Sequence, residues 1–317
     1  MEFKRDNILL NRLIILDGIG RSGKSLLADI IGSFHAVEKQ EYNPFLEYVA
    51  LAHKYNKISS DIAIAILKTE MDSALYKSMI GRQVNTRLSD LSSLYHYHSP
   101  SKYLKRAAEQ DGPIIYENVL KENPIYLTWC HDVINKSDIV FDAYGDRLDF
   151  IYSNRKPIEI IYDWVGINIS ERMSKDPTEM QYCIKYKDTT VPEVALGWEE
   201  EYLSVTPTER TIKMIYTFLK LNRDTLIKKR NYKNLHVFTF EDLVTNHEKE
   251  IGRLKTIIGN DPLPILDGIL AKGRCPRKLD SNDFLEKEKK ISQKISSCYV
   301  QLIAEMNDMY NSIRRIA

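Results

Sequence analysis

The stretch LIILDGIGRSGKS at residues 13–25 decides the fold of this chain. Its first four residues are apolar and predict a buried strand. Residues 18–25 then match the pattern G-x-x-x-x-G-K-[ST] at every fixed position, and LLADII at 26–31 has the spacing of an amphipathic helix. A strand, a glycine-rich loop and a helix in this order predict a phosphate-binding loop, or P-loop.

The residue types in this loop explain how it would bind an anion. Glycines let successive backbone N–H groups point at one phosphate, and the helix N-terminus adds partial positive charge. Lys24 adds a full charge, and Ser25 is placed to reach a phosphate or a Mg²⁺ ion. The alternative is a glycine-rich turn without a ligand. We predict that the nucleotide-binding residues of the loop are Gly18, Gly20, Arg21, Ser22, Gly23, Lys24 and Ser25.

The composition limits the class of protein. The 317 residues are 43% hydrophobic and 28% charged, and the net charge is +1. This is ordinary for a soluble globular protein, and no global field favours nucleic acid or an anionic membrane. No apolar run approaches the roughly 20 residues that span a bilayer. The polar N-terminus and four widely spaced cysteines predict a cytoplasmic protein without a signal peptide, disulfide framework or zinc site.

Short apolar runs separated by helical patterns predict an α/β fold, with a parallel sheet and helices on both faces. We expect one P-loop domain over residues 1–317. It contains a helical insertion at 41–110 over the carboxyl edge of the sheet, a lid or acceptor loop at 173–207 and a C-terminal helix at 283–315. The predicted strands are 12–17, 113–117, 138–142, 148–152 and 235–240.

Four separated segments together resemble the sulfotransferase family. GRSGKS at 20–25 is similar to that family's 5′-phosphate loop, R/K-S-G-T-T/S, and DFIYSNRKPIE at 149–159 is similar to its strand and R-x-P-x-D motif. VFTFEDL at 237–243 is similar to Y/F-E-D-L, and AKGRCPRK at 271–278 lies where the family has a basic loop over the nucleotide. The resemblance covers roughly residues 10–280 and implies a sulfotransferase-like fold that uses the sulfuryl donor PAPS (3′-phosphoadenosine 5′-phosphosulfate) without a metal. It also implies nucleotide contacts from Arg155 and Arg277.

Two residues depart from the family pattern. Lys24 replaces a threonine and restores the full motif of enzymes that use ATP or GTP. Asp163, eight residues after Arg155, replaces the serine that helps to hold the 3′-phosphate in the family. Two like charges 4 Å apart repel by about 4 kcal/mol at an effective dielectric of about 20, whereas an aspartate suits a free ribose hydroxyl. Both departures favour an ordinary nucleoside triphosphate.

Three alternatives keep PAPS open. Lys24 could hold the 5′-phosphate of PAPS, and Arg155 could neutralise Asp163 in an ion pair at the helix start. A shift of register would instead bring Ser153 or Ser170 to the family's serine position.

Both nucleotide assignments describe in-line transfer of a tetrahedral anion to a hydroxyl, which depends on positioning and on positive charge at the transferring group. Lys24 and Arg21 are predicted to supply this charge. Glu117 is the first choice for base or metal partner; Asp142 is the second choice and, with Ser25, a predicted Mg²⁺ ligand, and Asp17 is the third. For a sulfotransferase, the base candidates are Glu117, Glu47 and His53.

The leading hypothesis is therefore a kinase on a sulfotransferase-like fold. It would transfer a phosphoryl group from ATP or GTP with Mg²⁺ to a hydroxyl of a small molecule or glycan precursor. The alternative is a PAPS-dependent sulfotransferase acting on a carbohydrate or small-molecule hydroxyl. The third is a nucleotide-binding switch without turnover. Nothing in the sequence names the acceptor, and the C-terminal helix is compatible with a homodimer.

Overall fold

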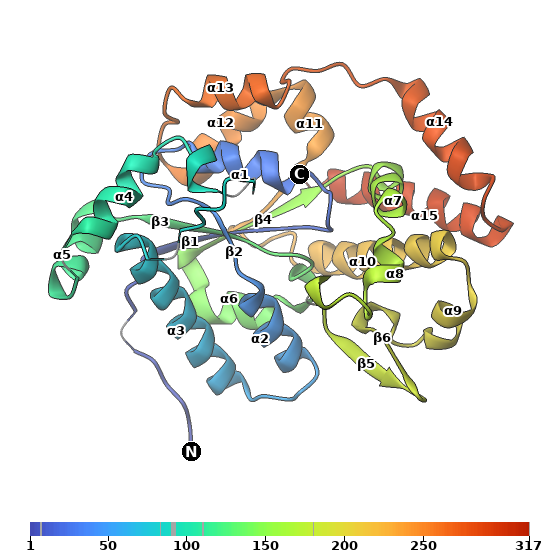
Figure 1. The fold of residues 1–317 in the computed structure, drawn as a ribbon, viewed down its shortest axis with the longest axis horizontal. Coiled ribbons are helices and arrows are strands. Elements are labelled where there is room, and N and C mark those ends of the chain that lie inside the picture. The colour runs from blue at the N-terminus through green and yellow to red at the C-terminus, as the bar shows by residue number, and fades with distance from the viewer. Residues whose placement is uncertain (7, 83, 90–92, 110, 180, 317) are drawn as a thin grey trace.

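The computed structural model describes residues 1–317 except 7, 83, 90–92, 110, 180 and 317. Its centre is a five-stranded sheet in the order β2-β3-β1-β4-β7, in which all pairs are parallel (Figure 1). The parallel sheet predicted from the sequence is confirmed. The strands are β2 (Glu41–Tyr42), β3 (Ile125–Trp129), β1 (Arg12–Asp17), β4 (Leu148–Asn154) and β7 (Leu235–Thr239).

Alternate residues of β1 supply the two cores, one on each face of the sheet. Leu13 and Ile15 belong to one buried cluster, and Ile14 and Leu16 belong to the other. All four are fully buried, as expected for a central strand covered by helices on both faces. The first core includes residues of α3, α6, α10 and α15, and the second includes residues of α1, α12 and α13.

The helices of the described chain are α1 (Lys24–Gly32), α2 (Pro44–Lys54), α3 (Ser60–Met79), α4 (Pro100–Ala108), α5 (Pro113–Glu122), α6 (Asp138–Tyr144), α7 (Pro157–Gly166), α8 (Ile169–Arg172), α9 (Glu199–Ser204), α10 (Pro207–Lys228), α11 (Phe240–Thr245), α12 (His247–Ile258), α13 (Leu266–Lys272), α14 (Ser281–Ser292) and α15 (Ser297–Arg314). A small antiparallel hairpin is formed by β5 (Cys183–Tyr186) and β6 (Thr189–Pro192). No helix in the described ranges is both long and apolar enough to cross a membrane.

Two predicted strands are wrong. Residues 113–117 form the first half of α5, which begins with Pro113 directly after Gly112. Residues 138–142 lie in α6, with Asp138 in its first turn. A short apolar run fits a buried helix as well as a strand, so periodicity could not separate the two. Between these two helices lies β3, a strand with the sequence IYLTW that was not among the predicted strands.

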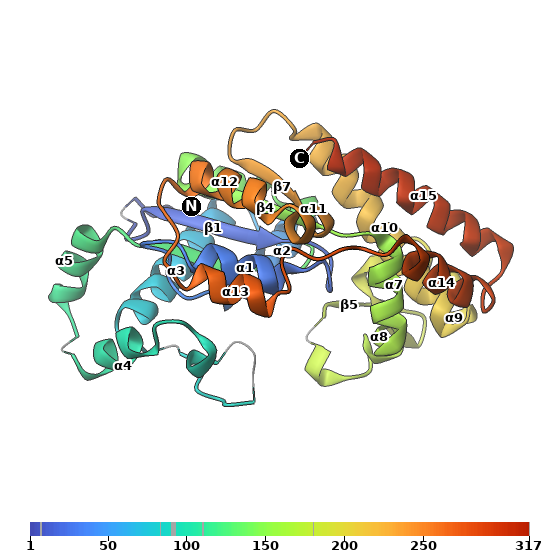
Figure 2. The same cartoon turned by 90° about the horizontal axis from the view of Figure 1, so that it is seen from above.

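The structure describes most of the three segments singled out in the sequence. Residues 41–110 contain β2, α2, α3 and α4; α2 lines the cavity at the carboxyl ends of the strands, and α3 packs against α6. Residues 173–207 contain the β5–β6 hairpin and α9. Residues 283–315 are divided between α14 and α15, and α15 runs along α10 of the same chain (Figures 1 and 2).

Candidate functional site

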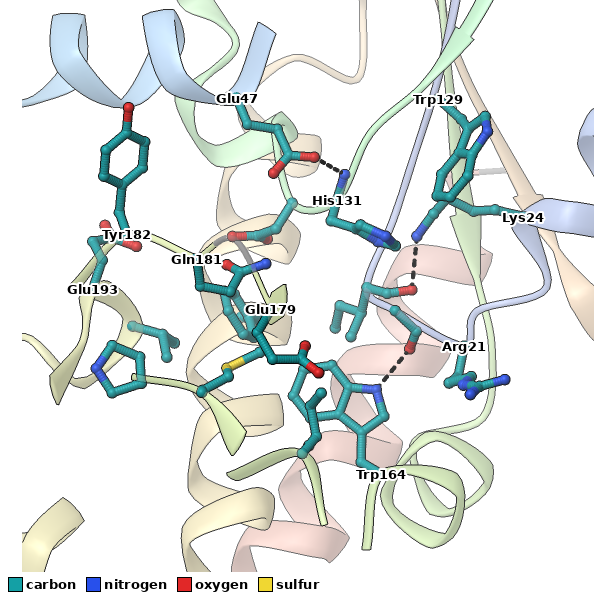
Figure 3. A pocket seen from close by; sticks show the side chains of 18 of the residues that line it. Arg21, Lys24, Glu47, Trp129, His131, Trp164, Glu179, Gln181, Tyr182 and Glu193 are labelled. Carbon is teal, nitrogen blue, oxygen red and sulfur yellow. Dashed lines mark hydrogen bonds between the residues drawn. The ribbon is translucent and has the colours of Figure 1, made fainter. Parts of the chain in front are cut away.

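A cavity of about 370 Å³ lies at the carboxyl ends of the central strands. The P-loop forms one wall, the start of α2 forms another, and residues 129–136 after β3 form the floor between them. The remaining wall comes from α7, α8 and the segment between Glu179 and Val194, which belongs to the predicted lid (Figure 3). Ligands of open parallel sheets bind at this edge.

The P-loop needs glycine at two positions. Gly18 has φ +142° and a Cβ there would lie 2.4 Å from the carbonyl oxygen of Ser153. Gly23, the N-cap of α1, has φ +93° and its Cβ would lie 2.3 Å from the ring of Phe240. Any larger residue would push the loop away from β4 and α11, so the left-handed turns and the close packing both select glycine.

Lys24 is buried and faces the cavity at the start of α1. Its Nζ donates to the carbonyl oxygens of Gly18 and Ile19, the latter at 3.0 Å. Burial lowers the pKa of Lys24 to about 8, against the opposing influence of the Asp17 and Glu47 carboxyl groups. The ammonium group is therefore mostly charged at neutral pH and stands where an anion in the cavity can meet it.

Arg21 and Ser25 are both exposed residues of the loop that line the cavity. The guanidinium group of Arg21 points away from Glu47 and His131, so Lys24 is the better placed of the two predicted cations (Figure 3). The Arg21 carbonyl oxygen accepts a hydrogen bond from Arg155 at 2.8 Å. This bond joins the P-loop to the segment that follows β4.

Arg155 forms the ion pair with Asp163 that the sequence left open. Its Nη1 lies 3.0 Å from Asp163 Oδ2, and its Nη2 lies 2.7 Å from Glu159 Oε2. Glu159 is also paired with Lys287 at 2.7 Å. Lys287 also pairs with Asp283 at 2.7 Å, so two cations are shared among three carboxylates, and the charge of Asp163 does not act alone on a ligand.

Ser153 and Ser170, the two serines that a shift of register would use, form hydrogen bonds to other groups. Ser153 Oγ donates to the carbonyl oxygen of Ser22 at 2.9 Å and so supports the P-loop from below. Ser170 Oγ donates to the carbonyl oxygen of Pro207, at the start of α10. Neither hydroxyl is directed at Arg155, so the structure gives no reason to shift the register.

Arg277 and Arg155 both lie close to the aromatic ring of Phe240. The guanidinium carbons of Arg155 and Arg277 lie 4.9 and 5.2 Å from the ring centroid, although the two residues are more than 100 positions apart in the chain. The Nε atom of each is buried and has no hydrogen-bond partner within the described part of the protein. Both arginines are half-buried, and an unmet donor on each guanidinium group suits an anionic ligand. Because the Phe240 ring also touches Gly23, this pair of arginines adjoins the P-loop.

His131 is a candidate functional residue that the sequence did not reveal. It follows the unpredicted strand β3, lines the cavity, and its ring packs edge-on against Trp129 with centroids 5.3 Å apart (Figure 3). Burial and the neighbouring Lys24 charge hold the pKa of His131 well below its usual range. The imidazole is therefore neutral at physiological pH and can accept a proton. If β3 had been predicted, His131 would have been expected at the carboxyl end of a parallel strand, where ligand-contacting residues commonly lie.

Two carboxyl groups flank His131. Glu47, one of the three predicted bases, comes from α2, and its Oε1 accepts the backbone N–H of His131 at 2.5 Å. Burial raises the pKa of Glu47 to about 8. Asp132 is 7% exposed and pairs with Lys136 at 3.0 Å. Burial also raises the pKa of Asp132.

The other predicted acidic and basic residues are elsewhere. Glu117 is exposed on α5, at the edge of the molecule opposite α7 (Figures 1 and 2), so its assignment as base is wrong. Asp142 is exposed on α6 beside a second cavity with Lys228 and Tyr232, so the predicted Mg²⁺ ligand is wrong as well. His53 bonds Ser60 Oγ at 2.9 Å and does not line the site.

Asp17 is buried beneath the P-loop, where Oδ2 accepts the N–H of Ile134 at 2.7 Å. It therefore fixes the turn that carries His131 rather than reaching the cavity. Among the residues that the structure describes, no group of three or more His, Cys, Asp or Glu side chains is arranged to hold a metal ion.

No protein-family model and no curated protein matches the sequence. Solved structures that resemble the fold are sulfotransferase domains, the family that the sequence motifs resemble. The domain from the Synechococcus PCC 7002 olefin synthase is 13% identical, with 98% of each chain covered and a TM-score of 0.49. The domain from the curacin biosynthetic pathway is 12% identical, covers 93% of this chain and 97% of its own, and has a TM-score of 0.47. The STF1 sulfotransferase of Mycobacterium tuberculosis H37Rv is 10% identical, covers 94% and 76%, and has a TM-score of 0.41. Similarity this distant carries no information about the reaction of this chain.

Proposed function

We propose that this protein is a PAPS-dependent sulfotransferase that transfers a sulfuryl group to a hydroxyl of a small molecule or carbohydrate. One observation carries the proposal: two unmet guanidinium donors, on Arg155 and Arg277, adjoin a P-loop across the Phe240 ring. A nucleoside triphosphate has a single phosphate chain for the loop. PAPS has a second phosphate on the ribose, which the two arginines are suited to hold.

The kinase hypothesis, with ATP or GTP and Mg²⁺, loses one of its two arguments. It rested on Lys24 and on the repulsion between Asp163 and a 3′-phosphate. The Arg155 ion pair at 3.0 Å offsets part of the Asp163 charge, since Arg155 is shared with Glu159, and so this repulsion is weaker than for a lone carboxylate. Lys24 serves either donor, because an ammonium group stabilises a transferring sulfuryl or phosphoryl group alike.

Each residue of the site then has a role in the transfer. The P-loop N–H groups and Lys24 hold the donor's 5′ end and stabilise charge on the transferring group. Arg155 and Arg277 hold the 3′-phosphate. The neutral imidazole of His131 takes the proton of the acceptor hydroxyl. The segment between Glu179 and Val194 covers the acceptor side of the cavity.

The first prediction tests the second anion site. In Arg277→Ala, we expect the affinity for adenosine 3′,5′-bisphosphate to fall about 10- to 100-fold, because a hydrogen bond to a charged group contributes roughly 1.5–3 kcal/mol. The affinity for adenosine 5′-monophosphate, which lacks the 3′-phosphate, should change less than threefold. Isothermal titration calorimetry without Mg²⁺ measures both.

Arg274→Ala is the matched control, because Arg274 is an exposed arginine of the same loop. It should bind both nucleotides as the wild type does. Mg²⁺-dependent binding of ATP or GTP, together with no binding of the bisphosphate, would overturn the proposal in favour of the kinase. Binding of nucleotide without transfer to any hydroxyl would favour the switch.

A second prediction follows from the pKa of Lys24, which burial lowers to about 8. The protonated ammonium binds an anion and the neutral amine does not. The protonated fraction falls about tenfold between pH 7 and pH 9, so the affinity for the bisphosphate should fall by up to tenfold over that interval. Titrations of Lys24→Met should lack this step, and an unchanged pH dependence in the variant would contradict the assignment.

A further inference from the structure

The turn between β4 and α7, which carries Arg155, is held by hydrogen bonds on both sides of that residue. Asn154 is the buried last residue of β4, and its Nδ2 donates to the carbonyl oxygen of Tyr310 at 3.4 Å. Lys156 is the N-cap of α7, and its backbone N–H donates to Glu241 Oε1 at 3.0 Å. The position of the Arg155 side chain therefore depends on contacts that its two neighbours make.

Glu241 replaces the usual capping interaction at the start of α7. In a capping box, a glutamate or glutamine three positions after the N-cap accepts the N-cap N–H. Glu159 has that position here, but its carboxylate is bound to Arg155 and to Lys287, each at 2.7 Å. Glu241, 85 positions from Lys156 in the chain, accepts the N–H instead. The carboxylate of Glu159 can therefore hold Arg155.

Tyr310 in turn fixes the carboxyl group of Glu241. Glu241 is 5% exposed, and its Oε2 accepts a hydrogen bond from the Tyr310 hydroxyl at 2.8 Å. Tyr310 is also buried and lies in α15, the last helix of the chain (Figure 2). Both oxygens of the buried carboxyl group are thus used as acceptors. Loss of the Tyr310 hydroxyl would leave one of them without a partner, which is costly.

Glu241 is also adjacent in the chain to Phe240, the ring that both arginines of the donor site approach. The guanidinium carbon of Arg155 lies 4.9 Å from the centroid of this ring, and that of Arg277 lies 5.2 Å from it. A contact that fixes Glu241 therefore also restricts the ring. The same two residues of α11 and α15 thus influence both the backbone beside Arg155 and the surface on which its side chain lies.

We infer that Tyr310 and Glu241 are positioning residues of the donor site, which hold Arg155 where it meets the 3′-phosphate of the nucleotide. The inference rests on the proposed sulfotransferase function, which assigns the 3′-phosphate to Arg155 and Arg277. Both positioning residues act through Arg155, because the protein itself uses the Tyr310 hydroxyl and both oxygens of Glu241. The C-terminal helix thereby contributes to the selection of a nucleotide with a 3′-phosphate.

The experiment removes the Tyr310 hydroxyl and leaves the ring in place. In Tyr310→Phe, we expect the affinity for adenosine 3′,5′-bisphosphate to fall about 5- to 20-fold, the effect of losing roughly one hydrogen bond, and that for adenosine 5′-monophosphate to change less than about twofold. Isothermal titration calorimetry of the full chain without Mg²⁺ gives the ratio of the two dissociation constants. A purely structural role would not change this ratio, because destabilisation affects both nucleotides alike.

Tyr299→Phe is the matched control. Tyr299 is also buried in α15, and its hydroxyl donates to Glu201 of α9 at 2.7 Å. The variant loses a hydrogen bond of the same kind at the other end of the helix. It should keep the wild-type ratio of dissociation constants.

Two replacements of Glu241 separate its position from its charge. Glu241→Gln keeps an acceptor for the Lys156 N–H and brings a donor for the Tyr310 oxygen, so its affinity for the bisphosphate should stay within about threefold of the wild type. A carboxylate that acted only through its charge would give a higher affinity on removal, because it repels a phosphate. Glu241→Ala removes both contacts, and we expect the affinity to fall about 10- to 100-fold.

A wild-type ratio in Tyr310→Phe overturns the inference, as does an equal loss in Tyr299→Phe or a clear gain of bisphosphate affinity in Glu241→Gln. Tyr310→Phe and Glu241→Gln keep the inference falsifiable even if Glu241→Ala does not fold. When Arg277→Ala lowers the ratio but Tyr310→Phe does not, the inference fails and the proposed donor site stands. When the wild type binds the bisphosphate no more tightly than the monophosphate, the proposed function fails and the inference with it.

Discussion

Replacement of Lys24 by methionine is expected to lower kcat about 100- to 1,000-fold, the cost of removing one preorganised charge from the transferring group. Lys24 is buried at the start of α1 and lines the cavity beside His131. Its ammonium group has little water to screen it, so its field at the transferring group is strong. Transfer of ³⁵S-labelled sulfate to an accepted hydroxyl compound under saturating PAPS measures the change in kcat.

The control for this variant is Lys229→Met. Lys229 is also a buried lysine, but it is packed between the rings of Phe141 and Tyr232, outside the cavity. Its loss should lower thermal stability and leave kcat within a factor of three. A Lys24→Met enzyme with wild-type kcat and a raised KM for PAPS would mean that Lys24 only binds the donor. Arg21→Ala should then be tested as the source of the charge.

Replacement of His131 by glutamine should lower kcat about 100- to 10,000-fold, the range for loss of a general base. The pKa of His131 is held well below its usual range by burial and by Lys24, so the imidazole is neutral near physiological pH. The wild-type rate should therefore be flat between pH 6 and pH 7.5. In the variant, the rate should rise with pH, because ionisation of the acceptor itself then limits transfer.

His53→Gln is the matched histidine control, since His53 bonds Ser60 and does not line the cavity. It should keep the wild-type rate and pH profile. Affinity for adenosine 3′,5′-bisphosphate should be unchanged in both histidine variants, because neither ring is needed for the donor. A large loss in His53→Gln with a normal His131→Gln would show that the base has been assigned to the wrong histidine.

Local features of the sequence were sufficient to predict a strand, a glycine-rich loop and a helix, while phosphate binding by this loop stays a prediction. The strand, the loop and α1 are consecutive, and the two glycines at φ +142° and +93° mark turns that other residues rarely adopt. The segments that contain Arg155 and Arg277 could also be identified from the sequence, because each lies in a motif that resembles one of the family. The strands of the sheet were predicted less accurately than this loop. Residues 113–117 and 138–142 are apolar runs that became helices, while IYLTW at 125–129 became β3.

The loss of β3 explains why the acceptor side could not be predicted. His131 and Asp132 lie at the edge of the sheet because β3 ends just before them. Glu47 joins them from 84 positions away, through its bond to the His131 N–H. Nothing in the residues around Glu47 indicates that contact, because it depends on where β2 and β3 pair and on how α2 leaves the sheet.

By itself, then, the sequence determined a glycine-rich strand–loop–helix unit in a parallel α/β fold, because conformations of consecutive residues follow from their own side chains. Tertiary structure alone decided three other features. It paired Asp163 with Arg155, brought Arg277 and Arg155 to the same Phe240 ring, and joined Glu47 to the backbone N–H of a buried histidine. Burial and charge at these positions come from segments distant in the chain, and the pKa of each group depends on that environment rather than on its own residue type.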